Sequence, residues 1–301
     1  MDYKAFTCFC VENKIEYRLD EPMKFHTSFK IGGPADVFVS VYSAEQFSLV
    51  IKKAKELSIP YFLLGKGSNL LVSDKGIEGI VINIIPMNEI SVNGTEITAM
   101  CGASLANVCT AALENGLTGL EFAYGIPGAV GGALYMNAGA YGGEMKQVVV
   151  SAEYIDSCGE IKKINADDMK LGYRTSIFET EKMPVVSVTF KLCNGEKTEI
   201  KAAMDDYMTR RKTKQPLEFP SAGSTFKRPE GHFAGALIEK NNLKGVAVGG
   251  AKVSEKHAGF LINYDNATCE DVLALMEKVK KVVYEADGIM LSPEVIFVGR
   301  K

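Results

Sequence analysis

The spacing of hydrophobic positions along the chain predicts several well-defined helices. Residues 43–57 place apolar side chains at the 3.6-residue period of a helix, at Phe47, Val50, Ile51, Ala54 and Leu57. Ser43 with Gln46 forms a capping-box pattern, and Pro60 ends the segment. Similar patterns predict helices over residues 104–115, closed by Gly116, over 199–212, and over 270–286 behind the cap Thr268.

Short runs rich in Val, Ile, Leu and Phe predict strands between these helices. The predicted strands cover residues 37–41, 61–64, 70–72, 79–85, 148–155, 184–192, 257–263 and 294–298. A capped turn is predicted at 165–171, and Pro216 with Pro220 marks a candidate domain boundary.

Composition narrows the class of protein. A chain of 301 residues predicts two or three domains, and 47% hydrophobic with 24% charged residues is typical of a globular protein. A net charge of −3 gives no indication of a nucleic-acid partner. No apolar run reaches the roughly 18 residues of a membrane span, and the N-terminus lacks a signal-peptide pattern, so we expect a cytoplasmic protein.

Cysteine and histidine spacing predicts neither disulfides nor a metal site. The seven cysteines form no C-x-x-C pair, and we expect them to be small buried hydrophobic residues. The three histidines lie far apart without metal-ligand spacing, so we expect no metal.

Residues 125–143, GIPGAVGGALYMNAGAYGG, hold seven glycines and almost no charge. Glycine lets another group approach the backbone closely, so this stretch does not predict a regular amphipathic helix. It is typical of backbone wrapped around a flat or phosphorylated group, with N–H groups free to donate. A buried turn of small residues is an equal alternative.

A second glycine-containing segment, residues 65–69 (GKGSN), lies between two predicted strands. It is neither a Walker A motif nor a Rossmann fingerprint, and an ordinary hairpin turn explains it equally well. With IGGPA at 31–35 upstream, the two segments together favour an extended, diphosphate-bearing cofactor lying across several loops.

These motifs, in this order, resemble the UDP-N-acetylenolpyruvoylglucosamine reductase family. The flavin-binding half is similar at IGGPA, GKGSN, GIPG (125–128) and N-x-GAYG (137–142). The active-site motifs are similar at YR-x-S-x-F (173–178), AGS-x-F (222–226) and PEV (293–295). The resemblance covers almost the whole chain.

The resemblance implies an α+β protein with an FAD-binding fold of the vanillyl-alcohol-oxidase (PCMH) type. The implied domains are two FAD-binding subdomains, 1–85 and 86–195, and a substrate-binding domain, 196–301. Non-covalent FAD would be reduced by NADPH, and a monomer would convert UDP-N-acetylglucosamine enolpyruvate to UDP-N-acetylmuramate for peptidoglycan precursor synthesis, and so for cell-wall biogenesis, cell shape and division.

The resemblance also implies roles for individual residues. Ser224 would donate a proton, while Arg174 and Glu294 would stabilise an enolate-like intermediate. The implied cofactor-binding residues are Ile31, Gly32, Gly33, Gly65, Lys66, Gly67, Ser68, Asn69, Gly125, Ile126, Pro127, Gly128, Asn137, Gly139, Ala140 and Tyr141. The implied substrate-binding residues are Tyr173, Arg211, Lys214, Arg228 and His257.

Each motif alone has a plainer explanation. Ser224 could be a turn residue, Arg174 a surface ion-pair partner, Glu294 the solvated end of a strand, and His257 a structural histidine.

Two features depart from the family's longer members. Only 50 residues separate Arg174 from Ser224, as in the shorter subclass, so no inserted tyrosine covers the substrate. Ile296 stands where many members have a basic residue, a role that Arg300 could take. An alternative function is an FAD-dependent oxidase of an alcohol or hydroxy acid on the same fold, and a non-enzymatic one is a nucleotide-sugar-binding module.

Overall fold

All four predicted helices form, and side-chain caps explain where three of them begin. α2 (Ala44–Glu56) starts at Ser43, whose hydroxyl accepts the Gln46 N–H at 3.2 Å, although Gln46 returns its bond to the Tyr42 N–H. The other three are α3 (Leu105–Glu114), α6 (Lys197–Lys214) and α8 (Cys269–Asp287). In α8 a complete capping box joins Thr268 and Asp271, and Gly288 closes the helix at φ 69°.

The eight predicted strands are also present, with ends shifted by a few residues at most sites. They are β2 (Pro34–Ser40), β3 (Tyr61–Leu64), β4 (Leu70–Val72), β5 (Ile77–Asn83), β11 (Val149–Ile155), β13 (Val185–Lys191), β17 (Leu261–Asn263) and β18 (Ile296–Val298). The predicted turn at 165–171 holds the short 3-10 helix η4 (Ala166–Met169).

Residues 1–301, the whole chain, are described by a computed structural model, and they form two units with separate cores. Unit 1 comprises Met1–Arg18, Val37–Lys66 and Gly79–Arg211, and unit 2 comprises Leu19–Asp36, Gly67–Glu78 and Lys212–Lys301. The chain passes from one unit to the other within β1 (Glu16–Pro22), β2, β5 and α6, and in the turn at 65–69. The three-part division at 85 and 195 remains a prediction.

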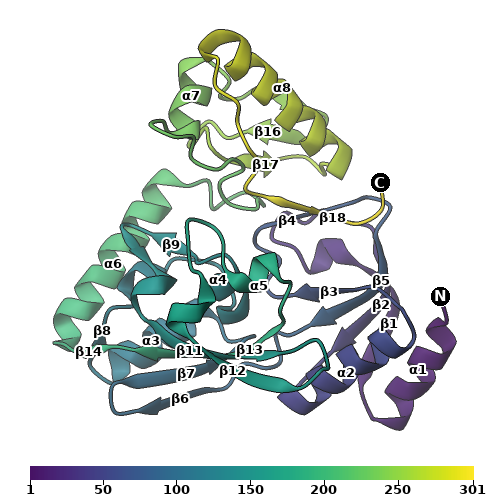
Figure 1. Cartoon of the computed structure of the whole chain (residues 1–301). Coiled ribbons are helices and arrows are strands. Elements are labelled where there is room, and N and C mark those ends of the chain that lie inside the picture. The colour runs from purple at the N-terminus through teal and green to yellow at the C-terminus, as the bar shows by residue number, and fades with distance from the viewer. The chain divides into compact units, whose positions relative to one another are not determined.

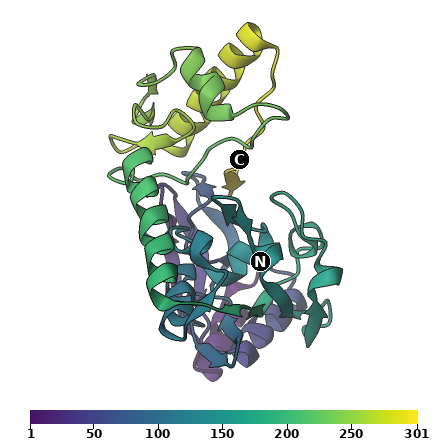
Figure 2. The same cartoon turned by 90° about the vertical axis from the view of Figure 1, so that its left-hand side faces the viewer.

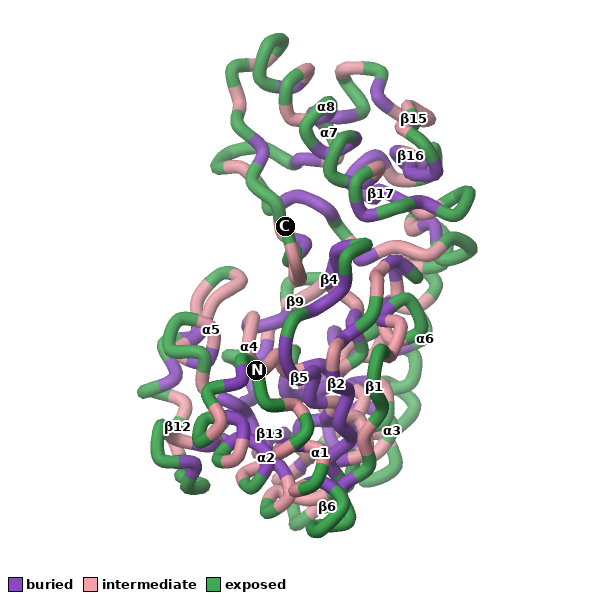
Figure 3. The backbone as a smooth tube through the Cα atoms, turned by 90° about the vertical axis from the view of Figure 1, so that its right-hand side faces the viewer, coloured by how far each residue is buried: buried purple, intermediate pink, exposed green.

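Unit 1 holds a five-stranded antiparallel sheet in the order β12-β11-β13-β7-β6, where β6 is Ile90–Asn93, β7 is Glu96–Met100 and β12 is Ile161–Asn165 (Figure 1). A second sheet has the order β1-β2-β5-β3. Strands β2, β5 and β13 run almost entirely buried, as Figure 3 shows. The remaining elements here are α1 (Tyr3–Glu12), β8 (Leu117–Thr118), η2 (Glu121–Ala123), α4 (Val130–Tyr135), β9 (Gly139–Ala140), β10 (Gly143–Glu144), η3 (Met145–Gln147), α5 (Ile177–Thr180) and β14 (Cys193–Asn194).

Unit 2 pairs helices with a small antiparallel sheet in the order β15-β16-β17 (Figure 1). Its other elements are η1 (Met23–Phe25), α7 (Ala234–Lys240), β15 (Ala247–Val248) and β16 (Ala251–Val253). α8 packs on α7 and on this sheet through Val272, Leu275 and Val279, all fully buried. β18 pairs in parallel with β4, Ile296 opposite Leu70, and so fixes the C-terminal segment beside the turn at 65–69.

Two predictions needed correction. The glycine-rich stretch is not irregular throughout, because its centre forms the helix α4. In this helix Val130, Ala133 and Leu134 are buried, and the helix packs against β13. Cys10, Cys101, Cys109 and Cys269 are buried as expected, but Cys8, Cys158 and Cys193 are exposed. Burial raises the pKa of Cys101 to about 12, which keeps that thiol protonated and inert.

Candidate functional site

Within unit 1, Gly65 at the start of the 65–69 turn lies against the 125–143 stretch. A Cβ built on Gly65 would lie 3.5 Å from the Cβ of Ala129, although 64 positions separate the two residues. Gly65, just after β3, and Ala129, just before α4, therefore line one place in unit 1, the arrangement that a cofactor spread over several loops requires.

The 125–143 stretch presents backbone with room in front of it, and the 65–69 turn presents backbone N–H groups. A Cβ on Gly128 would meet only Ile126 at 3.7 Å and Leu105 at 3.8 Å, and one on Gly132 would meet nothing within 4 Å. The N–H groups of residues 66–69 donate to no backbone carbonyl. Close approach and unused donors fit a flat cofactor that carries a diphosphate.

Other predicted cofactor glycines are explained by the packing of the chain on itself. A Cβ on Gly33 would lie 2.1 Å from the Asp74 carbonyl oxygen. One on Gly67, at φ 58°, would lie 2.2 Å from the His26 carbonyl oxygen. These positions need glycine whether or not a ligand is present.

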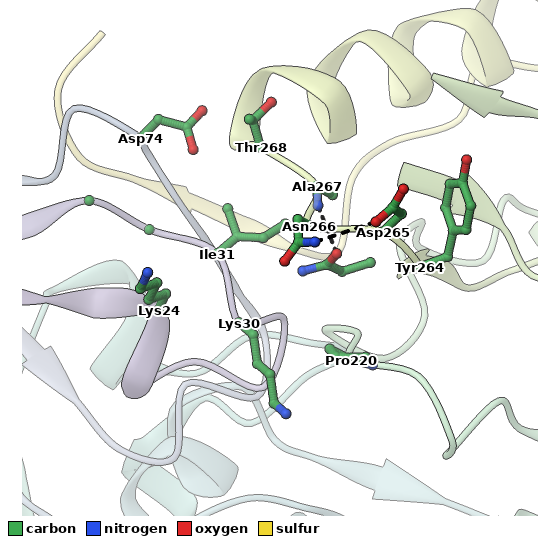
Figure 4. A pocket seen from close by; sticks show the side chains of 13 residues that line it. Lys24, Lys30, Ile31, Asp74, Pro220, Tyr264, Asp265, Asn266, Ala267 and Thr268 are labelled. Carbon is green, nitrogen blue, oxygen red and sulfur yellow. Dashed lines mark hydrogen bonds between the residues drawn. The ribbon is translucent and has the colours of Figure 1, made fainter. Parts of the chain in front are cut away.

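Residues 31–33 also line a polar pocket of about 510 Å³ in unit 2, which includes none of the other predicted site residues. Figure 4 shows Lys24, Lys30 and Asp74 around it, with residues 264–268 on the opposite side. The Asp74 carboxylate accepts the N–H groups of Cys269 and Glu270 and so caps α8.

The segment from Asn137 to Tyr141 turns back on itself in the β9–β10 hairpin. Tyr141 stands at the tip with φ 53°, and its ring stacks on Tyr207 of α6 with 4.7 Å between centroids and 8° between planes. Figure 2 shows α6 as one continuous helix. Tyr207 was not among the predicted residues, yet it lies four positions before Arg211, a spacing that places two side chains on the same helix face.

Arg211 lies against the glycine-rich stretch, since a Cβ on Gly125 would lie 3.1 Å from its Cδ. Burial lowers the pKa of its guanidinium, while the Tyr141 hydroxyl acts in the opposite direction. A half-buried cation next to this predicted cofactor segment is suited to an anionic group of a ligand.

Arg174 occupies a tight turn closed by two bonds, from the Gly172 N–H to the Thr175 carbonyl at 3.1 Å and from the Thr175 N–H to the Gly172 carbonyl at 3.3 Å. Its backbone has φ 56°, and its Nη1 reaches the Gly139 carbonyl at 3.5 Å. Its guanidinium also lies 5.6 Å from the ring of Tyr173, which is exposed. The predicted catalytic arginine is thus placed beside the β9–β10 hairpin.

In unit 2 the structure brings Ser224 and Glu294 onto neighbouring backbone segments, 70 positions apart in the chain. The residue after Ser224, Thr225, accepts the Glu294 N–H at 2.8 Å, and Phe226 pairs with Pro293. Ser224 itself pairs with Phe260 and is exposed, whereas Thr225 is buried.

The second half of the 65–69 turn joins this pair. Asn69 donates through its amide to the Glu294 carbonyl at 3.1 Å and accepts the Ile296 N–H at 2.9 Å. The Ser28 hydroxyl donates to the Ser221 carbonyl at 2.6 Å, and the Ser28 N–H donates to the Gly67 carbonyl at 3.2 Å. A predicted cofactor turn and two predicted catalytic residues therefore share one hydrogen-bonded framework.

The remaining predicted substrate residues of unit 2 are Lys214, His257 and Arg228. Burial lowers the pKa of His257, and the nearby charges of Lys244 and Lys214 act in the same direction. Its Nδ1 accepts the Gly259 N–H at 3.1 Å, which fits a neutral ring. Arg228 lies over the exposed Phe233 ring at 4.4 Å. Arg300 is ion-paired with Asp36, so its charge is already engaged.

The chain offers no metal centre and no membrane-spanning helix. No group of three or more His, Cys, Asp or Glu side chains could hold a metal ion. None of the helices combines the length and apolar character that crossing a bilayer would take.

Two family models match this chain. The FAD binding domain matches residues 35–165, and the C-terminal domain of UDP-N-acetylenolpyruvoylglucosamine reductase matches residues 215–298. Together they confirm the predicted fold class, α+β with an FAD-binding domain, and FAD as the cofactor.

Similar proteins of known name span the whole chain. The UDP-N-acetylenolpyruvoylglucosamine reductase of Clostridium perfringens (strain SM101) is 49% identical over 96% of this chain and 95% of its own. That of Clostridium novyi (strain NT) is 50% identical over 97% of both chains. The crystal structure of the Thermus caldophilus enzyme superposes with a TM-score of 0.81 at 34% identity, covering 94% of this chain and 98% of that one. The chain therefore belongs to the UDP-N-acetylenolpyruvoylglucosamine reductase family and is an FAD-dependent oxidoreductase.

Proposed function

We propose that this chain reduces the enolpyruvyl ether of UDP-N-acetylglucosamine to the lactyl ether of UDP-N-acetylmuramate, with NADPH as the reductant. The relatives that span its length carry the name of this reductase. The proposal includes non-covalent FAD, because the predicted flavin motifs offer backbone groups and small side chains and contain no Cys or His that could tether a flavin.

The observation that carries the proposal is the hydrogen bond that joins the Ser224–Thr225 segment to Glu294. The Glu294 N–H bonds to the carbonyl of Thr225, so two residues 70 positions apart are held next to each other. Ser224 is exposed at this point rather than buried in a turn. A hydroxyl and a carboxylate fixed on adjacent segments are suited to proton delivery and to orientation of a reacting carboxylated alkene.

FAD, when bound, would supply the hydride chemistry, with NADPH as the hydride source and the terminal carbon of the enolpyruvyl group as the hydride acceptor. Negative charge then develops on the adjacent carbon and the substrate carboxylate. Arg174 stabilises that charge, because a guanidinium can bind a carboxylate through two parallel hydrogen bonds. Glu294 orients the intermediate, and the Ser224 Oγ–H gives its proton to the carbon next to the carboxylate.

The proposed binding residues divide by chemistry. Gly65, Lys66, Ser68, Asn69 and the segment 125–128 would hold the flavin diphosphate and ring by backbone donors and close approach. The cations Arg211, Lys214 and Arg228, with Tyr173 and His257, would bind the nucleotide sugar. Tyr141, whose ring stacks on Tyr207, would contribute to the flavin site.

A spectroscopic test separates this function from the oxidase alternative. Under anaerobic conditions, NADPH should bleach the flavin, and UDP-N-acetylglucosamine enolpyruvate alone should then restore its colour. Steady-state double-reciprocal plots should be parallel, since NADP⁺ leaves before the second substrate reacts. Intersecting lines, or a reduced flavin that only oxygen reoxidises, would contradict the proposal.

A further inference from the structure

Asn137 resembles a cofactor ligand by motif, but its side chain is fully used inside the protein. The residue is 2% exposed and has a left-handed backbone, φ 43°. Its amide nitrogen donates to the Gly172 carbonyl at 2.9 Å and to Glu144 Oε2 at 3.1 Å, and its amide oxygen accepts the Lys146 N–H at 2.9 Å. Both amide hydrogens and the oxygen are engaged, so no donor is left for a cofactor.

The bond to Gly172 reaches the turn that carries Arg174. Gly172 opens this turn, and its carbonyl also accepts the Thr175 N–H at 3.3 Å. A single buried amide therefore ties the turn to the start of the β9–β10 hairpin. A second tie lies at the far end of the turn, where Ser176 Oγ donates to the Tyr135 carbonyl at 2.6 Å.

The Arg174 side chain is long and has many rotamers, so its position depends on the backbone that carries it. That backbone is left-handed, a conformation that non-glycine residues hold only when their surroundings fix it. The Asn137 amide supplies such a constraint at Gly172, two residues before Arg174.

We propose that Asn137 is a positioning residue for Arg174 rather than a flavin ligand, and that it couples the glycine-rich segment to the arginine turn. The expected effect on reoxidation by the enolpyruvyl substrate rests on the proposed function. The expected effect on the stability of the 172–175 turn does not. It assigns to one buried amide the task of holding the guanidinium where charge develops on the substrate.

Two variants test the tie. Asn137→Asp keeps the size and tolerates a positive φ but replaces the donor with a carboxylate, and Asn137→Gly removes the amide at a φ that glycine adopts freely. Both should retain bound flavin and normal reduction by NADPH. Reoxidation by the enolpyruvyl substrate should slow by ~10²-fold, the scale of a catalytic group displaced by about an ångström.

A double-mutant cycle shows whether the loss passes through Arg174. In the Arg174→Lys background, Asn137→Gly should add little further loss, because residues that act through one another are not additive. Asn242→Asp is the matched control, an exposed asparagine with φ 56° outside the site, and it should change neither half-reaction. Multiplicative losses in the double variant would overturn the proposal, as would loss of flavin with normal reoxidation of the remaining holoenzyme.

Proteolysis measures how often the 172–175 turn opens, independently of enzyme activity. Trypsin cleavage after Arg174, detected by mass spectrometry, should be faster in both Asn137 variants than in wild type or Asn242→Asp, because the turn opens more often. Unchanged cleavage in folded variants would contradict the tie. If the wild-type protein fails the enolpyruvyl test but the cleavage result holds, the proposed function is wrong while the structural coupling stands.

Discussion

Three residues with predicted roles have left-handed backbones without being glycine. They are Asn137 at φ 43°, Tyr141 at φ 53° and Arg174 at φ 56°. A left-handed backbone costs a non-glycine residue about 1–3 kcal/mol, so it persists only where the surrounding structure holds it. All three lie in or next to the β9–β10 hairpin and the 172–175 turn, so contacts in this part of unit 1 must hold their backbones.

Arg174→Lys tests whether that placement serves a guanidinium. Arginine and lysine meet the same difficulty in adopting the left-handed backbone at position 174, so the variant should fold and bind flavin. A lysine offers a point charge instead of a planar pair of donors, so kcat/KM for the enolpyruvyl substrate should fall by ~10²–10³. Steady-state kinetics would measure this fall in kcat/KM, and the rate of flavin reduction by NADPH should stay constant. Near-normal turnover would contradict a role of Arg174 in charge stabilisation.

His257 should titrate below its ordinary pKa of 6.5, because burial disfavours the charged ring and Lys244 and Lys214 repel it. Its unfolded form then binds a proton at a higher pH than its native form. The free energy of unfolding should therefore fall as pH drops through 6.5 toward the native pKa, and the fall should be smaller in His257→Asn. An NMR titration midpoint at or above 6.5 would refute the assignment of a neutral ring.

At the scale of elements, strand register decides which side chain at 224–226 is exposed. Thr225 is buried, and its hydroxyl accepts the Leu261 N–H at 3.1 Å, while Ser224 just before it is exposed. A slip of one residue would bury Ser224 and expose Thr225. The bridges to Phe260 and Pro293 hold the register that presents the serine.

Gly128→Val tests the proposed cofactor cradle, formed in unit 1 by Gly65 and the stretch before α4. The nearest atoms to a Cβ at 128 lie at ordinary contact distance, 3.7 and 3.8 Å, so the chain itself should accept the side chain. Its methyl groups would occupy space that the cofactor needs, and the purified protein should melt cooperatively yet hold little FAD. Gly128→Ala should hold an intermediate amount. Full flavin occupancy in the valine variant, measured by absorbance per chain, would mean that the cradle lies elsewhere.

At the scale of the whole molecule, the sequence predicted the elements whose signals are local. α2, α3 and α8 each have a cap and a periodic apolar face, and the family motifs correctly indicated FAD as the cofactor. The hairpin of β6 and β7 was missed, although Asn93-Gly94 between alternating residues is a hairpin signal. α4 was missed because its glycines oppose helix formation and its burial against β13 outweighs them.

Contacts between distant segments could not be inferred from local patterns. Nothing in the order of residues indicates that Thr225 accepts the Glu294 N–H, or that the Asn137 amide binds Gly172. The motif placed Asn137 with the flavin ligands, and only the three-dimensional partners of its amide indicate another task. The exposure of Cys8, Cys158 and Cys193 likewise depends on which faces the fold covers.

The measurement that most directly tests the account is stopped-flow absorbance of both flavin half-reactions in Ser224→Ala. The substitution removes the proposed proton donor without adding bulk. Flavin reduction by NADPH should be unchanged, and reoxidation by UDP-N-acetylglucosamine enolpyruvate should slow by ~10²–10⁴, the range for loss of a positioned general acid. Ser224→Cys should retain more of that second rate, since a thiol can also give a proton. Equal slowing of both half-reactions, or slowing of the NADPH half alone, would contradict the role of Ser224 as the proton donor.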